Sequence, residues 1–338
     1  MKLIVKRKIR SLPDMNALSN NLSQAALKWG CRLAGGVSLI LSLILALPIA
    51  AAAADIGTTF ATPEEAVAAL VTAAATSGSG SMRALFGPGI VDLQNPDRVQ
   101  GTNEVKAFKA ALDAKHQLVR ESDTQYVLEL GTNDWPFPIP LMKQPDGRWF
   151  FDTEAGKEEL LNRRIGQNEL SALQTVRAYV DAQREYASRD RNGDEVLEYA
   201  QRIASTPGNK DGLYWPPDLD GEISPLGPMV AEAQSGGYGA VKGQASTRLP
   251  FHGYHFKILT RQGKNAPGGK YDYIINGHMI GGFALVAWPA EYGQSGIMTF
   301  IVNQQGRVYQ KDLGAKTAKT AVGMKSYDPD KTWTISRD

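Results

Sequence analysis

The stretch Glu158–Arg189, EELLNRRIGQNELSALQTVRAYVDAQREYASR, combines strong helix formers with a single glycine at Gly166. A glycine favours the left-handed conformation that ends a helix, and Asn168 is a good residue to cap the next one. The spacing therefore predicts two helices, with a boundary between two domains near Gly166. In the second helix we expect one buried stripe, formed by Leu170, Leu173, Val176 and Val180.

Strand-like segments follow this helix. Runs rich in β-branched and aromatic residues occur at 254–263, 281–293 and 296–314. Glycine-containing turn signals separate them, as expected for strands that return antiparallel to one another. A long helix followed by such strands predicts an α+β domain over residues 167–338.

Helices also precede strands in the region before Gly166. Thr62, followed by Pro63 and two glutamates, is typical of the start of a helix. Three strand-like runs come later, separated by glycine and proline: HQLVRES, QYVLELG and RWFFDTE. We therefore expect a small helix-plus-antiparallel-sheet domain over residues 58–166, and an α+β fold for the chain as a whole.

The first 54 residues have the layout of a secretory signal. Seven lysines and arginines precede or border an uncharged apolar run from Leu33 to Ala54, which ends in small residues suited to a signal peptidase. We expect residues 1–54 to be removed and the mature protein to reach the periplasm or the extracellular space. The alternative is an uncleaved anchor in the inner membrane that faces the periplasm, because the apolar run is long enough to cross a bilayer.

Removal of this segment changes what the composition implies. The whole chain carries 37 basic and 35 acidic residues, but residues 1–54 hold seven of the basic residues and only one acid. The mature chain is therefore net negative and has no basic patch typical of a nucleic-acid partner. The only cysteine, Cys31, is also in this segment. Disulfides, thiol catalysis and cysteine-bound metals are excluded from the mature chain.

The stretch Asp190–Gln201, DRNGDEVLEYAQ, resembles part of a calcium-binding loop. Oxygen ligands are present where an EF-type loop needs its first three, at Asp190, Asn192 and Asp194, and Glu198 can supply another carboxylate. However, glutamate replaces the glycine of the sixth position, and glutamine replaces the terminal acid. We favour a structural turn in which Asp194 caps a helix that carries Glu198, with calcium as the alternative.

Histidines are the other candidates for chemistry. The chain has four, and His278 in the glycine-rich sequence NGHMIGG is the best candidate for an exposed reactive group. A hydroxyl from a distant residue, such as that of Ser295, is a possible partner for it. No zinc-protease, nucleophile-elbow or phosphate-loop motif occurs in the chain.

Two aromatic and proline-rich segments are candidates for a binding surface. The first is DWPFPIPL, which contains Trp135 and Phe137, and its alternating prolines predict an extended segment at the edge of a sheet. The second is LYWPP, which contains Tyr214 and Trp215 in a corner rich in turn-forming residues. For both segments, burial in the core is the alternative to ligand binding.

Several of these segments carry a resemblance to a known family. The chain resembles the bacterial "domain of unknown function 2950" family in the sequences EYAQRIASTPGNKDGLYWPP, FHGYHFKILTRQG and GGFALVAWPAEYGQSGIMTFIVN. That resemblance implies an exported protein and specifies no activity. Residues 168–315 are also similar to the soluble half of type II secretion pseudopilins. No prepilin cleavage motif leads into the helix, so this second likeness implies a shared fold and does not imply a pilus.

Two functions are consistent with these features. The first is a non-enzymatic binding or structural module of the cell envelope, which binds an envelope protein or a small molecule through one of the aromatic segments. The alternative is a cell-envelope hydrolase that uses His278 or the acidic loop 190–198. We expect no nucleic-acid partner. We expect contact with a membrane only through residues 1–54, if this segment is not cleaved.

The predicted export can be tested directly. Amino-terminal sequencing of protein recovered from the cell envelope should begin after residue 54, because the alanine-rich end of the apolar run offers a cleavage site. Membrane-extracted protein that still begins with Met1 would show that the segment is an anchor instead.

Overall fold

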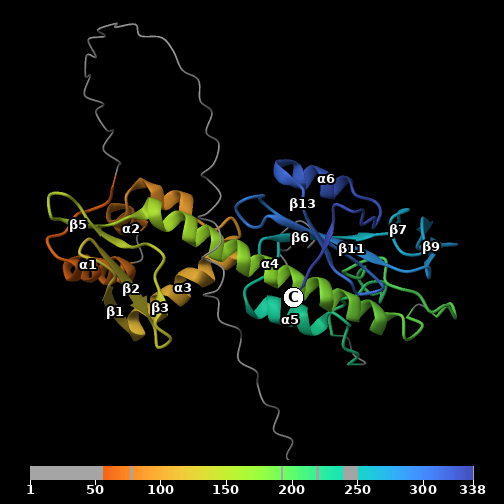
Figure 1. The fold of residues 1–338 in the computed structure, drawn as a ribbon. Helices are drawn as coiled ribbons and strands as arrows, with labels where there is room; N and C mark the ends of the chain where they lie inside the picture. The colour runs from red at the N-terminus through yellow and green to blue at the C-terminus, as the bar shows by residue number, and fades with distance from the viewer. Residues whose placement is uncertain (1–55, 77–78, 192, 218–220, 239–249, 338) are drawn as a thin grey trace, which may run out of the picture. The chain divides into compact units, whose positions relative to one another are not determined.

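The computed structural model describes residues 56–76, 79–191, 193–217, 221–238 and 250–337 (Figure 1). Helices and antiparallel sheets together make it an α+β protein, as the sequence predicts. The predicted signal segment, residues 1–54, lies outside the described residues. Within the described ranges, no helix has the length and apolar character needed to cross a membrane.

Helices come first along the described chain. They are α1 (Pro63–Ala75), α2 (Ser79–Phe86), the 3-10 helix η2 (Pro88–Leu93) and α3 (Arg98–Ala114). Thr62 caps α1 as predicted, since its hydroxyl accepts a hydrogen bond from the backbone N–H of Glu65. Asp97 caps α3 in the same way, through the backbone N–H groups of Val99 and Gln100.

An antiparallel sheet follows these helices. Its strands are β1 (His116–Arg120), β2 (Gln125–Leu130), β3 (Trp135–Pro136), β4 (Leu141–Lys143) and β5 (Trp149–Phe151). They are ordered β1-β2-β4-β5, with β3 paired to β2. One buried cluster joins this sheet to α1, α2 and α3, and its fully buried members include Leu70, Leu112, Leu130 and Phe151.

A single helix, α4 (Thr153–Tyr186), occupies the stretch in which the sequence predicts two. Gly166 lies inside it, and Asp152 is its N-cap through the backbone N–H of Ala155. The prediction of a break was wrong, because Asn168 has a tertiary role rather than a capping role. Its fully buried amide accepts a hydrogen bond from Gln100 and donates one to the carbonyl of Ser295.

The buried stripe of α4 is confirmed in three of its four predicted positions. Leu173, Val176 and Val180 are buried, whereas the side chain of Leu170 is 55% exposed. Glu169 beside it accepts hydrogen bonds from the backbone N–H groups of Ile297 and Met298. At this turn, α4 therefore contacts the following sheet through polar side chains rather than through a leucine.

The chain after α4 contains a second antiparallel sheet. Its order is β14-β13-β12-β11-β6, and its strands are β6 (Tyr254–Leu259), β11 (Ala284–Pro289), β12 (Met298–Asn303), β13 (Tyr309–Asp312) and β14 (Thr334–Ile335). Two further pairs of short strands lie outside it: β7 (Arg261–Gln262) with β8 (Tyr271–Asp272), and β9 (Ile274–Ile275) with β10 (His278–Met279). The helices in this part are α5 (Gly227–Ser235), η4 (Gly314–Lys316) and α6 (Thr317–Gly323).

A second buried cluster joins α4 to this sheet. Every residue of β11 is buried, as is each residue of β12 except Met298. Tyr179 and Tyr254 are among the large side chains in the cluster. The described residues thus have two hydrophobic cores, one formed before α4 and one formed by α4 with the strands that follow it. The domain boundary near residue 166 stays a prediction.

Gln183 joins α4 to a segment without regular structure. Its buried amide donates a hydrogen bond to the carbonyl of Ala200 and accepts one from the N–H of the same residue. These two bonds reproduce the pairing that a neighbouring strand would offer. The side chain of Gln183 is 0% exposed, so these bonds do not compete with water in the folded protein.

We expect the substitution Gln183→Ala to lower the free energy of unfolding by about 3 kcal/mol, because it leaves two buried backbone groups unpaired. The matched control is Gln174→Ala, at an exposed position of the same helix, where a change within about 0.5 kcal/mol is expected. Urea unfolding of both variants measures the difference, and equal losses would contradict this role of Gln183.

Candidate functional site

The acidic segment after α4 is not helical. Residues 195–200 have no regular secondary structure, so the prediction that Asp194 caps a helix carrying Glu198 was wrong. Asp194 instead accepts a hydrogen bond through its Oδ1 atom from the N–H of Val196. Glu195 has a φ angle of 64°, a left-handed conformation that a helix interior does not permit.

Asp190 holds the beginning of this segment. Its two carboxylate oxygens accept hydrogen bonds from the N–H groups of Gly193 and Glu195, at 2.8 and 2.9 Å. Asn192, the second predicted oxygen ligand, lies outside the described residues. The carboxylate of Asp190 thus folds the turn through backbone contacts.

Backbone hydrogen bonds place the rest of the segment beside β10. The N–H of Tyr199 donates to the carbonyl of Met279, and the N–H of Met279 donates to the Oε2 atom of Glu198. The side-chain amide of Gln201 donates to the carbonyl of Gly277. Together with the bonds of Gln183 to Ala200, these contacts fix where the carboxylate of Glu198 points.

The hairpin of β9 and β10 presents His278 to this segment. Asn276 and Gly277 connect the strands with φ angles of 52° and 91°, the conformation of the two-residue hairpin turn that Asn-Gly favours. The register pairs His278 with Ile275. His278 therefore follows a tight turn, which limits the positions that its ring can take.

Asp194, Glu198 and His278 meet at this point. The Nδ1 atom of His278 lies 3.4 Å from Asp194 Oδ2 and 3.5 Å from Glu198 Oε2. The three atoms all lie within 4.8 Å of one another. Each of these residues is a candidate from the sequence, but their meeting is not predictable from it, because about 80 positions separate the acids from the histidine and no spacing rule connects them.

The aromatic corner lies in the same part of the chain. Trp215 is only 3% exposed, and its indole N–H donates to the carbonyl of Glu222. The hydroxyl of Ser224 donates to the carbonyl of Trp215. The guanidinium of Arg191 lies over the indole ring, 5.4 Å from its centre. Trp215 is therefore a fixed structural element at this corner.

Glu222 balances the positive charges around this indole. Its carboxylate pairs with Arg191 and with Lys210, the latter at 2.7 Å. The hydrogen bond from Lys210 is the main reason why the pKa of Glu222 is below its ordinary value, and Arg191 lowers it further. The anionic carboxylate is thus held in place between two cations and the aromatic corner.

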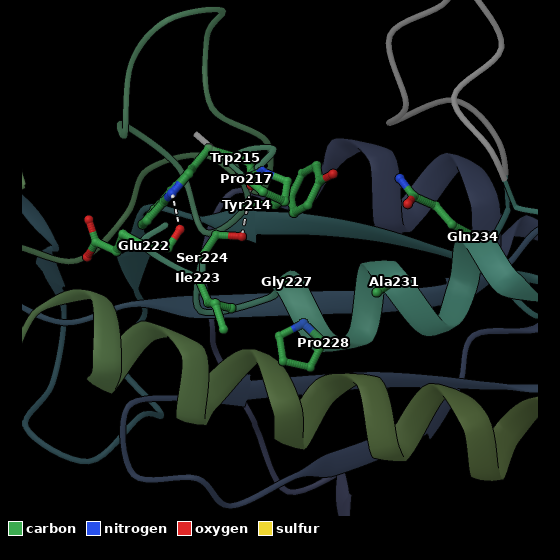
Figure 2. Close-up of a pocket in the computed structure, with 10 residues that line it drawn as sticks. All are labelled: Tyr214, Trp215, Pro217, Glu222, Ile223, Ser224, Gly227, Pro228, Ala231 and Gln234. Atoms are coloured by element: carbon green, nitrogen blue, oxygen red, sulfur yellow. Dashed lines mark hydrogen bonds between the residues drawn. The ribbon is translucent and has the colours of Figure 1, made fainter. Parts of the chain in front are cut away.

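A cavity of about 310 Å³ opens between this corner and α5 (Figure 2). Aromatic rings, prolines and aliphatic side chains form most of its wall, with polar groups from Glu222, Ser224 and Gln234. The lining residues are Tyr214, Trp215, Pro217, Glu222, Ile223, Ser224, Gly227, Pro228, Ala231 and Gln234. We call this space the corner cavity.

The first proline-rich segment is divided between surface and core. Trp135 is 41% exposed, and the guanidinium of Arg163 lies 5.2 Å from the centre of its ring. Phe137 packs in the first core, with its ring centre 5.3 Å from that of Phe108. Trp135 is thus the accessible aromatic residue of the two that the sequence singled out in DWPFPIPL.

We expect Trp215→Ala to lower the free energy of unfolding by about 3–5 kcal/mol, because it empties a buried space and removes the stacking partner of Arg191. Trp135→Ala is the matched control at an exposed indole and should cost about 1 kcal/mol or less. Chemical denaturation of both variants decides the point. If Trp135→Ala lowers the free energy of unfolding more than Trp215→Ala does, the aromatic corner is not a centre of stability.

Comparison with known proteins places the chain in a family. No curated protein matches it, and no solved structure matches it, so the similarity to pseudopilins is not confirmed. One family profile does match, over residues 57–335, which covers most of the chain and all of the segments described above. The chain therefore belongs to the family described as "Protein of unknown function (DUF2950)".

Proposed function

We propose that this protein is a non-enzymatic binding module of the cell envelope, and that the corner cavity receives an aromatic group of its ligand. The observation that carries this proposal is the lining of the cavity by Tyr214, Trp215, Pro217 and Pro228. Its volume of about 310 Å³ lies at the lower end of the range for small-molecule sites, which begins at about 300 Å³.

The walls of the corner cavity are set before a ligand arrives. Pro217 and Pro228 have fixed φ angles, and hydrogen bonds hold Trp215 to the carbonyl of Glu222 and to the hydroxyl of Ser224. A preformed apolar wall reduces the entropy lost on binding. This arrangement supports binding of a rigid group of matching size.

Polar groups at the edge of the cavity indicate which aromatic groups suit it. The amide of Gln234 both donates and accepts hydrogen bonds, whereas the carboxylate of Glu222 is already paired with Arg191 and Lys210. An indole or a phenol combines an apolar ring with one N–H or O–H donor. We therefore propose a ligand that presents such a group, either a small molecule or an aromatic side chain of an envelope protein.

The hydrolase alternative has weaker support in the described residues. A histidine that activates a hydroxyl needs that hydroxyl within hydrogen-bond distance. The Nδ1 atom of His278 is buried and accepts or donates no hydrogen bond within the described part of the chain. The hydroxyl of Ser295 instead exchanges hydrogen bonds with the backbone of Glu291. The geometry therefore favours a binding role over nucleophilic catalysis.

Filling the corner cavity should abolish binding of a small aromatic probe. Ala231 lines the cavity from α5, so Ala231→Phe should place a ring where the probe would bind. We expect saturation-transfer NMR to detect indole and p-cresol on the wild-type protein, and both signals to fall at least tenfold in Ala231→Phe.

The matched control is Ser235→Phe, which adds the same side chain to an exposed position of α5 outside the lining. This variant should bind both probes as the wild type does. Equal signals from all three proteins would place the aromatic site elsewhere. A peptide ending in tryptophan, compared with free indole, distinguishes a protein ligand from a small molecule.

A further inference from the structure

We propose that Asp194, Glu198 and His278 bind one divalent transition-metal ion of the zinc class. The two carboxylates come from the irregular segment after α4, and the imidazole comes from the β9–β10 hairpin. The ion would join two parts of the chain that are far apart in sequence. This site is separate from the corner cavity, and neither proposal depends on the other.

Two of the three separations in the cluster match the spacing of ligands around a shared ion. Zinc binds histidine nitrogen and carboxylate oxygen at about 2.0–2.2 Å, so two ligand atoms of a tetrahedral site lie roughly 3.4 Å apart. The Nδ1 atom of His278 lies 3.4 Å from Asp194 Oδ2 and 3.5 Å from Glu198 Oε2. The third separation is also within the 4.8 Å that encloses the whole cluster.

The orientation of the histidine is a second observation that points to an ion. Its side chain is 32% exposed, but the Nδ1 atom itself is buried and forms no hydrogen bond with the residues that the structure describes, although it lies at ion-pair distance from the two carboxylates. A buried nitrogen without a partner is costly, and most such atoms in proteins are bonded. In the neutral imidazole with its proton on Nε2, Nδ1 offers a lone pair on the side of the two carboxylates, where all three side chains could coordinate one cation.

The carboxylates are already oriented by the backbone. Asp194 uses Oδ1 to accept a hydrogen bond from Val196, while its Oδ2 atom faces the histidine. Glu198 Oε2 accepts a hydrogen bond from the N–H of Met279. Outer contacts of this kind fix the direction of ligand atoms and strengthen metal binding. The side chain of Glu198 is only 16% exposed, which limits its alternative positions.

The donor set favours zinc over calcium. Calcium prefers six to eight oxygen ligands, whereas this cluster offers one nitrogen and two oxygens from three side chains. Imidazole with carboxylates suits zinc and similar transition metals. Asp190 is the first ligand of the calcium-binding loop that the sequence suggests. Its carboxylate binds the N–H groups of Gly193 and Glu195, and it is not one of the three residues of the cluster.

A bound ion would stabilise the folded state. It would bind the native arrangement of segment 194–198 and the hairpin, and the unfolded chain offers no such arrangement. The ion would thereby act with the hydrogen bonds of Gln183 and Met279 to hold an otherwise irregular segment. This predicts a structural site whose removal loosens the segment and lowers the melting temperature.

The test uses the purified full chain without a polyhistidine tag, after treatment with EDTA. Titration calorimetry with zinc should show one ion per chain. A saturating zinc concentration should raise the Tm by roughly 5 °C or more relative to the chelated protein. His278→Gln and Glu198→Gln should each weaken zinc binding at least tenfold and lose the rise in Tm.

The matched control is Glu195→Gln, which removes a carboxylate from the same segment at an exposed position outside the cluster. This variant should bind zinc as the wild type does. The Tm of each variant in EDTA, compared with that of the wild type, shows whether the variant has folded. The visible spectrum of the cobalt-substituted protein then reports whether the ion is four-coordinate.

Three results would overturn the proposal. The first is a wild-type protein that binds no zinc, and the second is equal binding by the wild type, His278→Gln and Glu198→Gln. The third is a rise in the Tm of the wild type with calcium that is absent in Asp190→Asn and still present in His278→Gln. That result would show an oxygen-only site in the loop. Indole binding should be unchanged in His278→Gln, so failure of the metal site and failure of the corner cavity remain distinguishable.

Discussion

The amide of Gln183 is the contact on which both candidate sites depend. It pairs with the N–H and the carbonyl of Ala200 from inside α4, where water has no access. Glu198 lies two residues before Ala200, so the pairing of Gln183 with Ala200 sets its position. In the other direction, Ile203 accepts a hydrogen bond from the N–H of Tyr214, at the start of the aromatic corner. One polar side chain thus orders a segment that has no regular structure of its own.

Arg191 connects the acidic turn to the aromatic corner. It follows Asp190 directly in the chain, yet its guanidinium stacks over Trp215 and pairs with Glu222. Its side chain is only 5% exposed. A buried charge of this kind is tolerated because the carboxylate neutralises it and the indole face attracts it. The proposed metal cluster and the corner cavity therefore share a structural support, although their ligands would bind independently.

Part of the candidate site could be predicted from the sequence, because some of its signals are local. Asn276-Gly277 predicts a tight hairpin turn, and His278 directly after it is the histidine that the structure places among carboxylates. The acidic segment around Asp194 was also recognised by its composition. What no local signal provides is the pairing of these two segments, since it depends on backbone bonds such as that from Tyr199 to Met279.

The sequence by itself determined the features that depend on neighbouring residues. Thr62 caps α1, and Val176 and Val180 face the core, because capping and helical spacing act within a few positions. Tertiary structure decided that α4 continues through Gly166, because Asn168 has buried partners in Gln100 and Ser295. It likewise decided that Asp194 meets His278. Contacts between distant segments replace local preferences in both places, since a buried polar group must find its partner wherever the fold provides one.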